Sequence, residues 1–173
     1  MDIGSAEQHA VLQQFITLCE RDERIVAAFL GGSIAAGTAD EWSDLDIYLI
    51  TTDAAYEDFI ARLPEFVRRL GRPVFLENFD RPDQLFFIFT DGTEGELRAG
   101  RESRFLDIHA GSYKVLVDKK GLLEGVTFRG DQPTQDAQVE TVRRQLYWFW
   151  HVRAGVHQQG LGQLSKVAWP GKR

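Results

Sequence analysis

The chain has 173 residues, of which 43% are hydrophobic, so it can bury one well-packed core but is too short to assume two complete domains. Its 26 acidic residues outnumber its 20 Lys and Arg residues, and the net charge of −6 argues against a protein that wraps the nucleic-acid backbone. The single cysteine, Cys19, excludes an internal disulfide, and no apolar run reaches the roughly eighteen residues of a membrane span, so we expect a cytoplasmic protein without nucleic-acid or membrane partners.

Two elements are predicted in the first thirty residues. Apolar residues recur every three or four positions over residues 10–19, which predicts an amphipathic helix with Cys19 in the core. Residues 25–30 form a short unbroken apolar run, which is typical of a buried strand. Two glycines, Gly31 and Gly32, then end this strand.

A strand and a helix are predicted next. Over residues 45–51 polar and apolar side chains alternate with a period of two, which indicates a strand with two chemically different faces. Asp53 is expected to be the N-cap of a helix that extends to Leu70 and that Pro64 kinks or splits.

The remaining chain predicts further strands and a final helix. Asp91-Gly92 is a strong signal for a tight hairpin turn. The strands are expected over residues 73–79, 84–90, 93–99 and 113–118, followed by a connector to residue 133 and a helix from residue 134. This order predicts an α/β (α+β) fold with a mixed sheet and helices packed on one side, a domain over residues 1–133, and a C-terminal helical segment over 134–173 that looks like an incomplete helical domain.

The glycines at the end of the first strand indicate a phosphate-binding turn. Gly31 and Gly32 let the backbone approach phosphate oxygens without a β-carbon in the way. Ser33 adds a hydroxyl where a short helix would begin and where free N–H groups point outward. We expect Gly32 and Ser33 to bind a phosphate chain.

A pair of carboxylates follows at the start of the second predicted strand. Asp44 and Asp46 are two residues apart, so both side chains project from one face, with Leu45 behind them. Two close carboxylates repel each other unless a cation lies between them, and Mg²⁺ prefers such oxygen ligands together with substrate phosphates. A third acid, Glu94 or Glu96, comes from the returning strand of the hairpin. If this third carboxylate lies on the same face of the sheet as Asp44 and Asp46, the three carboxylates can hold two metal ions.

The order of these motifs resembles a known signature. The signature consists of Gly31-Gly32-Ser33, ten further residues, and then Asp44-Leu45-Asp46 at the start of an apolar strand. It resembles the signature of the nucleotidyltransferase superfamily typified by DNA polymerase β, and most of all that of the aminoglycoside and lincosamide branch. The resemblance implies that residues 1–133 are the catalytic domain, that Asp44, Asp46 and Glu96 are catalytic and hold two Mg²⁺ ions, and that Gly32 and Ser33 contact the triphosphate.

The choice of Glu96 also comes from this resemblance. In aminoglycoside 6-adenylyltransferases a Phe-rich strand, an acidic-Gly turn and a strand with the third carboxylate follow one another, as do residues 86–90, Asp91-Gly92 and Glu96-Leu97 in this chain. This alignment favours Glu96 over Glu94. The family commonly has Asp as its third carboxylate, so Glu96 departs from the family pattern.

Other sites are less favoured by the sequence. A Rossmann dinucleotide site lacks its Gly-x-Gly-x-x-Gly pattern, and the segment after Gly32 is too short for a crossover helix. His109 more often satisfies a turn than orients a substrate. Arginines 98, 101 and 104 either bind phosphates or form a solvated face.

The predicted function is transfer of a nucleoside monophosphate, expected to be AMP from ATP, to a hydroxyl of a small aminoglycoside-like acceptor. The alternative is a non-catalytic nucleotide-binding or partner-binding module on the same fold. A homodimer with Trp148 and Trp150 at its surface is also considered, because uncovered large aromatics mark interfaces.

Overall fold

The computed structural model describes residues 5–40, 42–130, 139–140, 142–143 and 146. The chain divides into two compact units, residues 1–131 and 132–173, and the elements below belong to the first. Most of the predicted C-terminal helical segment, including Trp148 and Trp150, lies outside the described residues. Within the described residues no helix is long and apolar enough to cross a membrane.

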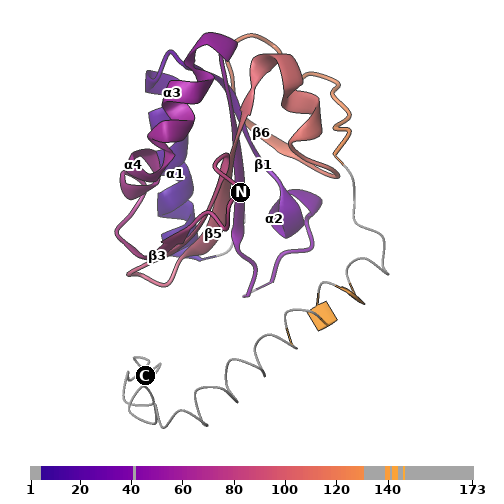
Figure 1. Cartoon of the computed structure of the whole chain (residues 1–173). Coiled ribbons are helices and arrows are strands. Elements are labelled where there is room, and N and C mark those ends of the chain that lie inside the picture. Colours follow the sequence, from indigo (N-terminus) through magenta and orange to yellow (C-terminus); the bar gives the residue numbers. More distant parts are fainter. Residues whose placement is uncertain (1–4, 41, 131–138, 141, 144–145, 147–173) are drawn as a thin grey trace, which may run out of the picture. The chain divides into compact units, whose positions relative to one another are not determined.

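The first unit alternates helices and strands (Figure 1). Its helices are α1 (Ala6–Arg21), α2 (Gly32–Ala36), α3 (Tyr56–Ala61) and α4 (Leu63–Arg68), with 3-10 segments η1 (Asp53–Ala55) and η2 (Glu102–Asp107). Its strands are β1 (Ile25–Leu30), β2 (Leu45–Thr51), β3 (Pro73–Glu77), β4 (Gln84–Phe89), β5 (Glu94–Arg101) and β6 (Lys114–Asp118).

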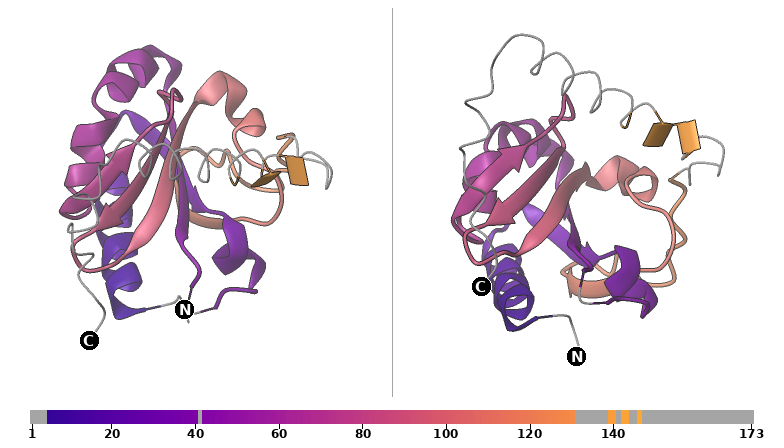
Figure 2. Two further views of the ribbon diagram at one scale, coloured as in Figure 1. Left: turned by 60° about the horizontal axis from the view of Figure 1, so that its bottom comes forward. Right: turned by 90° about the horizontal axis from the view of Figure 1, so that it is seen from below.

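The six strands form one mixed sheet in the order β3-β4-β5-β2-β1-β6. Figure 2 shows the ribbon from two further directions. Every neighbouring pair is antiparallel except β2 and β5, which are parallel. The predicted fold class is therefore confirmed. Because β2 and β5 run in the same direction, the residues at their N-terminal ends lie side by side, and this places Asp46 next to Glu96.

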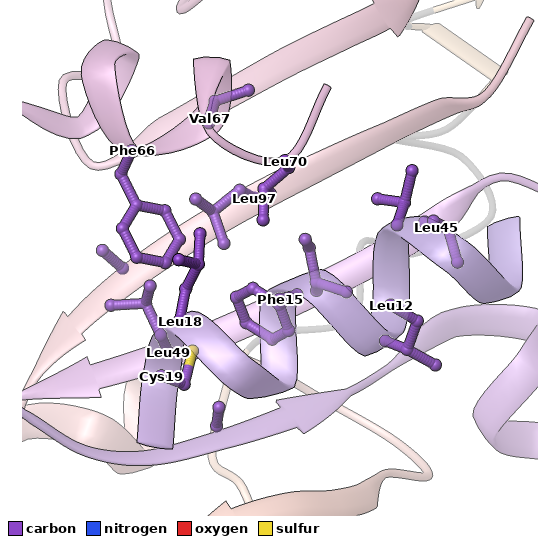
Figure 3. Packing of buried hydrophobic residues seen from close by; sticks show 14 of the residues in the cluster. Leu12, Phe15, Leu18, Cys19, Leu45, Leu49, Phe66, Val67, Leu70 and Leu97 are labelled. Atoms are coloured by element: carbon purple, nitrogen blue, oxygen red, sulfur yellow. The ribbon is translucent and has the colours of Figure 1, made fainter. Parts of the chain in front are cut away.

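Helices α1, α3 and α4 cover one face of the sheet. Figure 3 shows buried side chains of α1 and α4 packed against strands β2 and β5: Leu12, Phe15, Leu18 and Cys19 from α1, Phe66 and Val67 from α4, Leu70 after it, and Leu45, Leu49 and Leu97 from the strands. Cys19 has no exposed surface, as predicted. These helices form because their apolar residues recur at helical intervals, and burial of each large side chain contributes about 1.5–3 kcal/mol.

Part of the opposite face has a second core, and here the predicted connector is wrong. Residues 119–130 contain no regular helix or strand, but Leu123 and Phe128 are only 1% and 8% exposed and pack with Phe29 and Ile50. The apolar side chains of this Gly-rich segment do not recur at regular intervals. The sequence pattern therefore could not distinguish a segment that covers the sheet from a linker. Asp46 and Glu96 remain only partly buried.

Two local predictions need correction. Asp53 is not an N-cap, because it is the first residue of η1 and its carboxylate accepts hydrogen bonds from the backbone N–H and hydroxyl of Ser103. Helix α1 begins at Ala6, four residues earlier than expected, because Ser5 and Gln8 form a capping box. The predicted split at Pro64 is found, with Pro64 in the first turn of α4.

Candidate active site

The turn between β1 and α2 is held directly against β2. The Gly31 N–H donates a hydrogen bond of 2.8 Å to the Asp46 carbonyl. Gly32 has a φ of +60°, and a β-carbon at this position would lie 1.6 Å from Oδ2 of Asp46. Only glycine fits at this position, because both its conformation and the nearby carboxylate exclude a side chain.

Ser33 lies in the first turn of α2 and is partly buried. Within the described residues its hydroxyl makes no hydrogen bond, and the N-cap residue Gly31 provides no side-chain cap for the helix. The hydroxyl and the first N–H groups of α2 are therefore available to an anionic ligand next to Asp46.

The structure places the predicted carboxylates at neighbouring strand positions. Asp46 and Glu96 are direct partners in the β2–β5 ladder, so their side chains project from the same face of the sheet. Asp44 is exposed and comes immediately before β2. Glu94 is exposed and lies two residues before Glu96, at the start of β5.

Burial and neighbouring carboxylates both raise pKa values in this group. Burial, followed by the charges of Asp44 and Glu96, raises the pKa of Asp46 to about 7. Within the described residues no donor forms a hydrogen bond to the Asp46 carboxylate that would offset this effect. Burial also raises the pKa of Glu96 above its usual value, although a hydrogen bond from Gln84 opposes the rise.

Glu96 is fixed by two side chains from adjacent strands. Nε2 of Gln84 donates a hydrogen bond of 2.8 Å to one oxygen, and the hydroxyl of Tyr48 donates a longer one of 3.5 Å to the other. Gln84 is itself held by Arg81, whose Nη1 donates to its Oε1 at 2.9 Å. In the described part of the chain, no group of three or more metal-ligating side chains is already gathered in a metal-binding geometry.

A pocket of about 470 Å³ opens beside these carboxylates. It is lined by Gly32, Asp46, Tyr48, Arg81, Arg98, Asp107, Ile108, His109, Ala110 and Gly130. Arg98 is anchored in its wall by donating hydrogen bonds to Asp83 at 3.1 Å and to the Ile108 carbonyl at 3.0 Å.

His109 contributes to the same wall and also satisfies a turn. Its Nε2 lies 3.0 Å from the Ser112 carbonyl oxygen, and its ring centroid is 4.8 Å from that of Tyr48. Burial lowers the pKa of His109, so the imidazole is neutral at physiological pH. It is therefore a polar wall residue that adds no positive charge.

The other two arginines lie away from this pocket. Arg101 forms an ion pair with Glu57, and its guanidinium lies 4.2 Å from the Tyr56 ring centroid. It lines a neighbouring pocket of about 710 Å³ together with Arg98 and the exposed Arg104. Two of the three arginines thus pair with protein carboxylates.

Sequence reasoning did not identify Tyr48, Gln84 and Arg81 as parts of the site. Tyr48 could have been found, because it shares the period-two face of Asp46. The roles of Gln84 and Arg81 depend on the register of β4 against β5, which no local pattern specifies.

The model of a family described as nucleotidyltransferase domain matches residues 12–105. No curated protein matches the chain. An aminoglycoside 6-adenyltransferase from Bacillus subtilis is 18% identical, with a TM-score of 0.43 over 58% of this chain and only 36% of that protein. A chain from a toxin–antitoxin structure with AMP-PNP is 15% identical, with a TM-score of 0.30 over 89% of this chain and 98% of its own.

Proposed function

The chain belongs to the nucleotidyltransferase domain family, whose model matches more than half of it, and from this premise we propose that it transfers AMP from ATP to a hydroxyl of a small-molecule acceptor with the help of Mg²⁺. The observation that carries this proposal is the pairing of Asp46 with Glu96 on one face, directly against the Gly32 turn. This neighbourhood supports a phosphate-binding turn beside a set of metal ligands.

The residues present suit a divalent cation. All the candidate ligands are carboxylate oxygens, which Mg²⁺ prefers, and burial together with the charges of Asp44 and Glu96 raises the pKa of Asp46, an effect that a bound cation would oppose. Asp46 and Glu96 are direct partners on adjacent strands, and Asp44 is two residues from Asp46, so the three carboxylates come from neighbouring backbone positions. We propose that Asp44, Asp46 and Glu96 hold two Mg²⁺ ions. The ions would supply charge neutralisation of the phosphates and of the developing negative charge.

The remaining steps belong to the chain's own residues. Gly32 and Ser33 would bind the triphosphate with backbone N–H groups and the free hydroxyl. The acceptor oxygen would then bond to the α-phosphorus while the bond from that phosphorus to the bridging oxygen breaks, and pyrophosphate leaves. The hydroxyl proton would pass to a nearby carboxylate. Because the displacement is in line, the acceptor approaches from the side opposite the pyrophosphate.

Pyrophosphate release tests this proposal. Purified chain is incubated with ATP, Mg²⁺ and a panel of aminoglycosides, lincosamides and polyols, and we expect release that depends on both metal and acceptor. Glu96→Gln should lower the rate by at least a hundredfold, whereas Glu94→Gln, the exposed glutamate two residues away, should leave it nearly unchanged. ATP binding without release under any condition would instead support a non-catalytic nucleotide-binding module.

A further inference from the structure

Beyond Glu96 the same face of the sheet becomes aromatic. Phe86 is the direct partner of Glu96 in the β4–β5 ladder, so the two side chains share a face. The ring centroid of Phe79 lies 5.4 Å from that of Phe86, and that of Phe75 lies 6.3 Å from Phe79. We call Phe75, Phe79 and Phe86 the aromatic patch. Its outer rings are open, since Phe79 is 60% exposed and Phe75 is 41% exposed.

The aromatic patch continues the line of the candidate active site. Asp46, Glu96 and Phe86 are paired residues on three successive strands, β2, β5 and β4. Adjacent strands are about 4.8 Å apart, so the Phe86 backbone lies about 10 Å from that of Asp46. Gly32 contacts Asp46 at the other end of this row. Phe86 is thus one strand beyond Glu96, and Phe79 contacts Phe86.

The turn that presents Phe79 has an unfavourable backbone conformation. Phe79 and Asp80 have φ values of +46° and +64°, in the left-handed region that suits Gly or Asn and not a bulky residue. The turn is fixed by Oε1 of Glu77, which accepts from the Phe79 N–H, and by Oδ1 of Asn78, which accepts from the Asp80 N–H. Although the Phe79 ring contacts Phe75 and Phe86, the residue stays 60% exposed, so burial provides little compensation for the strained backbone. Strained residues of this kind concentrate at ligand sites.

We infer that the acceptor carries a flat apolar ring close to its reacting hydroxyl, and that this ring stacks on Phe79 and Phe86. The inference rests on the proposed function: with the triphosphate at Gly32 and Ser33, an in-line acceptor would approach from the side away from the pyrophosphate, and Glu96 and Phe86 lie on the strands beyond Asp46. Aromatic faces bind flat rings by stacking. The acceptor class narrows to compounds such as nucleosides and aryl glycosides, in preference to polycationic aminoglycosides without a flat ring.

A matched pair of probes tests the ring directly. Phenyl β-D-glucoside and methyl β-D-glucoside have the same hydroxyls and differ only in the ring. Saturation-transfer NMR on the full chain, with Mg²⁺ and a non-hydrolysable ATP analogue, should show contact to the phenyl protons and tighter binding of the phenyl compound. Phe79→Asn, which suits the left-handed backbone, should weaken phenyl glucoside about tenfold and leave methyl glucoside unchanged. Val115→Ala, an exposed apolar residue on the opposite edge strand β6, is the control and should change neither.

Several results would overturn the inference. Equal binding of both glucosides, or an unchanged affinity of Phe79→Asn for phenyl glucoside, would show that the aromatic patch does not bind the acceptor ring. A loss of ATP affinity in Phe79→Asn would assign the aromatic patch to the nucleobase, and a fall in mass by light scattering would assign it to contact between copies of the chain. Pyrophosphate release reports separately on the proposed function. No release despite binding of phenyl glucoside contradicts the transferase proposal, whereas equal release with both glucosides contradicts only the inference that the acceptor carries a ring.

Discussion

Replacement of Asp46 by Asn should stabilise the metal-free protein at neutral pH and above. The Asp46 carboxyl has a pKa of about 7 in the folded chain, against an ordinary 3.8, because it is buried beside Asp44 and Glu96. A tenfold change in acid dissociation corresponds to about 1.4 kcal/mol, so this difference sets an upper limit of about 4 kcal/mol. Asp46 is partly exposed to solvent, and screening reduces the expected gain to about 2 kcal/mol.

The sign of the pH dependence follows from the raised pKa. Below about pH 4 the carboxyl is protonated in both the folded and the unfolded chain, and Asp46→Asn should have little effect. Between about pH 4 and 7 the unfolded chain loses its proton first, so the wild-type free energy of unfolding falls relative to the variant, and above pH 7 the difference is constant.

Urea denaturation in EDTA at pH 4, 5.5 and 8 measures this difference. Asp44→Asn is the control, because Asp44 is exposed and its replacement should stabilise the protein much less. With Mg²⁺ the order should reverse, because the ion stabilises only the chain that binds it. Wild type and Asp46→Asn with the same free energy of unfolding at all three pH values would refute the reasoning.

Three further variants, one of them with a matched control, test other parts of the site. Ser33→Ala should weaken ATP binding by about 1–2 kcal/mol in calorimetry with an unchanged Tm; a lower Tm with the same affinity would make Ser33 only a structural residue. Gly32→Ala should abolish pyrophosphate release, because its β-carbon would lie 1.6 Å from the Asp46 carboxylate. Gly37→Ala is the control: Gly37 has a φ of +74° and nothing within 4 Å of an added β-carbon, so this variant should lose only about 1 kcal/mol of stability and keep its activity. Gln84→Leu removes the 2.8 Å donor to Glu96, so the Glu96 pKa should rise further and the acidic limb of the pH–rate profile should move to higher pH; an unmoved limb would show that Glu96 does not control it.

Periodicity predicted the elements on which the site is built. The apolar run of β1, the alternation in β2 and the Asp-Gly turn before β5 are each local, and each is found within two residues of the expected position. Where the site depends on pairing between distant strands, the sequence was less informative. The sequence did not decide whether Asp46 and Glu96 share a face, which depends on the parallel β2–β5 register. The hydrogen bond from Gln84 to Glu96 was not predicted.

The errors have the same physical origin. Asp53 fits the statistics of an N-cap, but Ser103, fifty residues later, competes for its carboxylate. The role of residues 119–130 follows from Leu123 and Phe128 covering a sheet face that only the folded topology creates. Tertiary contacts of this kind override local preference, so they could not be read from spacing alone.

Calorimetric titration of ATP into the full chain tests the central claim most directly. We expect ATP affinity to fall at least tenfold when Mg²⁺ is replaced by EDTA, and to fall equally in Asp46→Asn with Mg²⁺ present, because metal and triphosphate each offset the charge of the other among the carboxylates. Equal affinity in all three conditions would contradict a metal site formed by Asp44, Asp46 and Glu96.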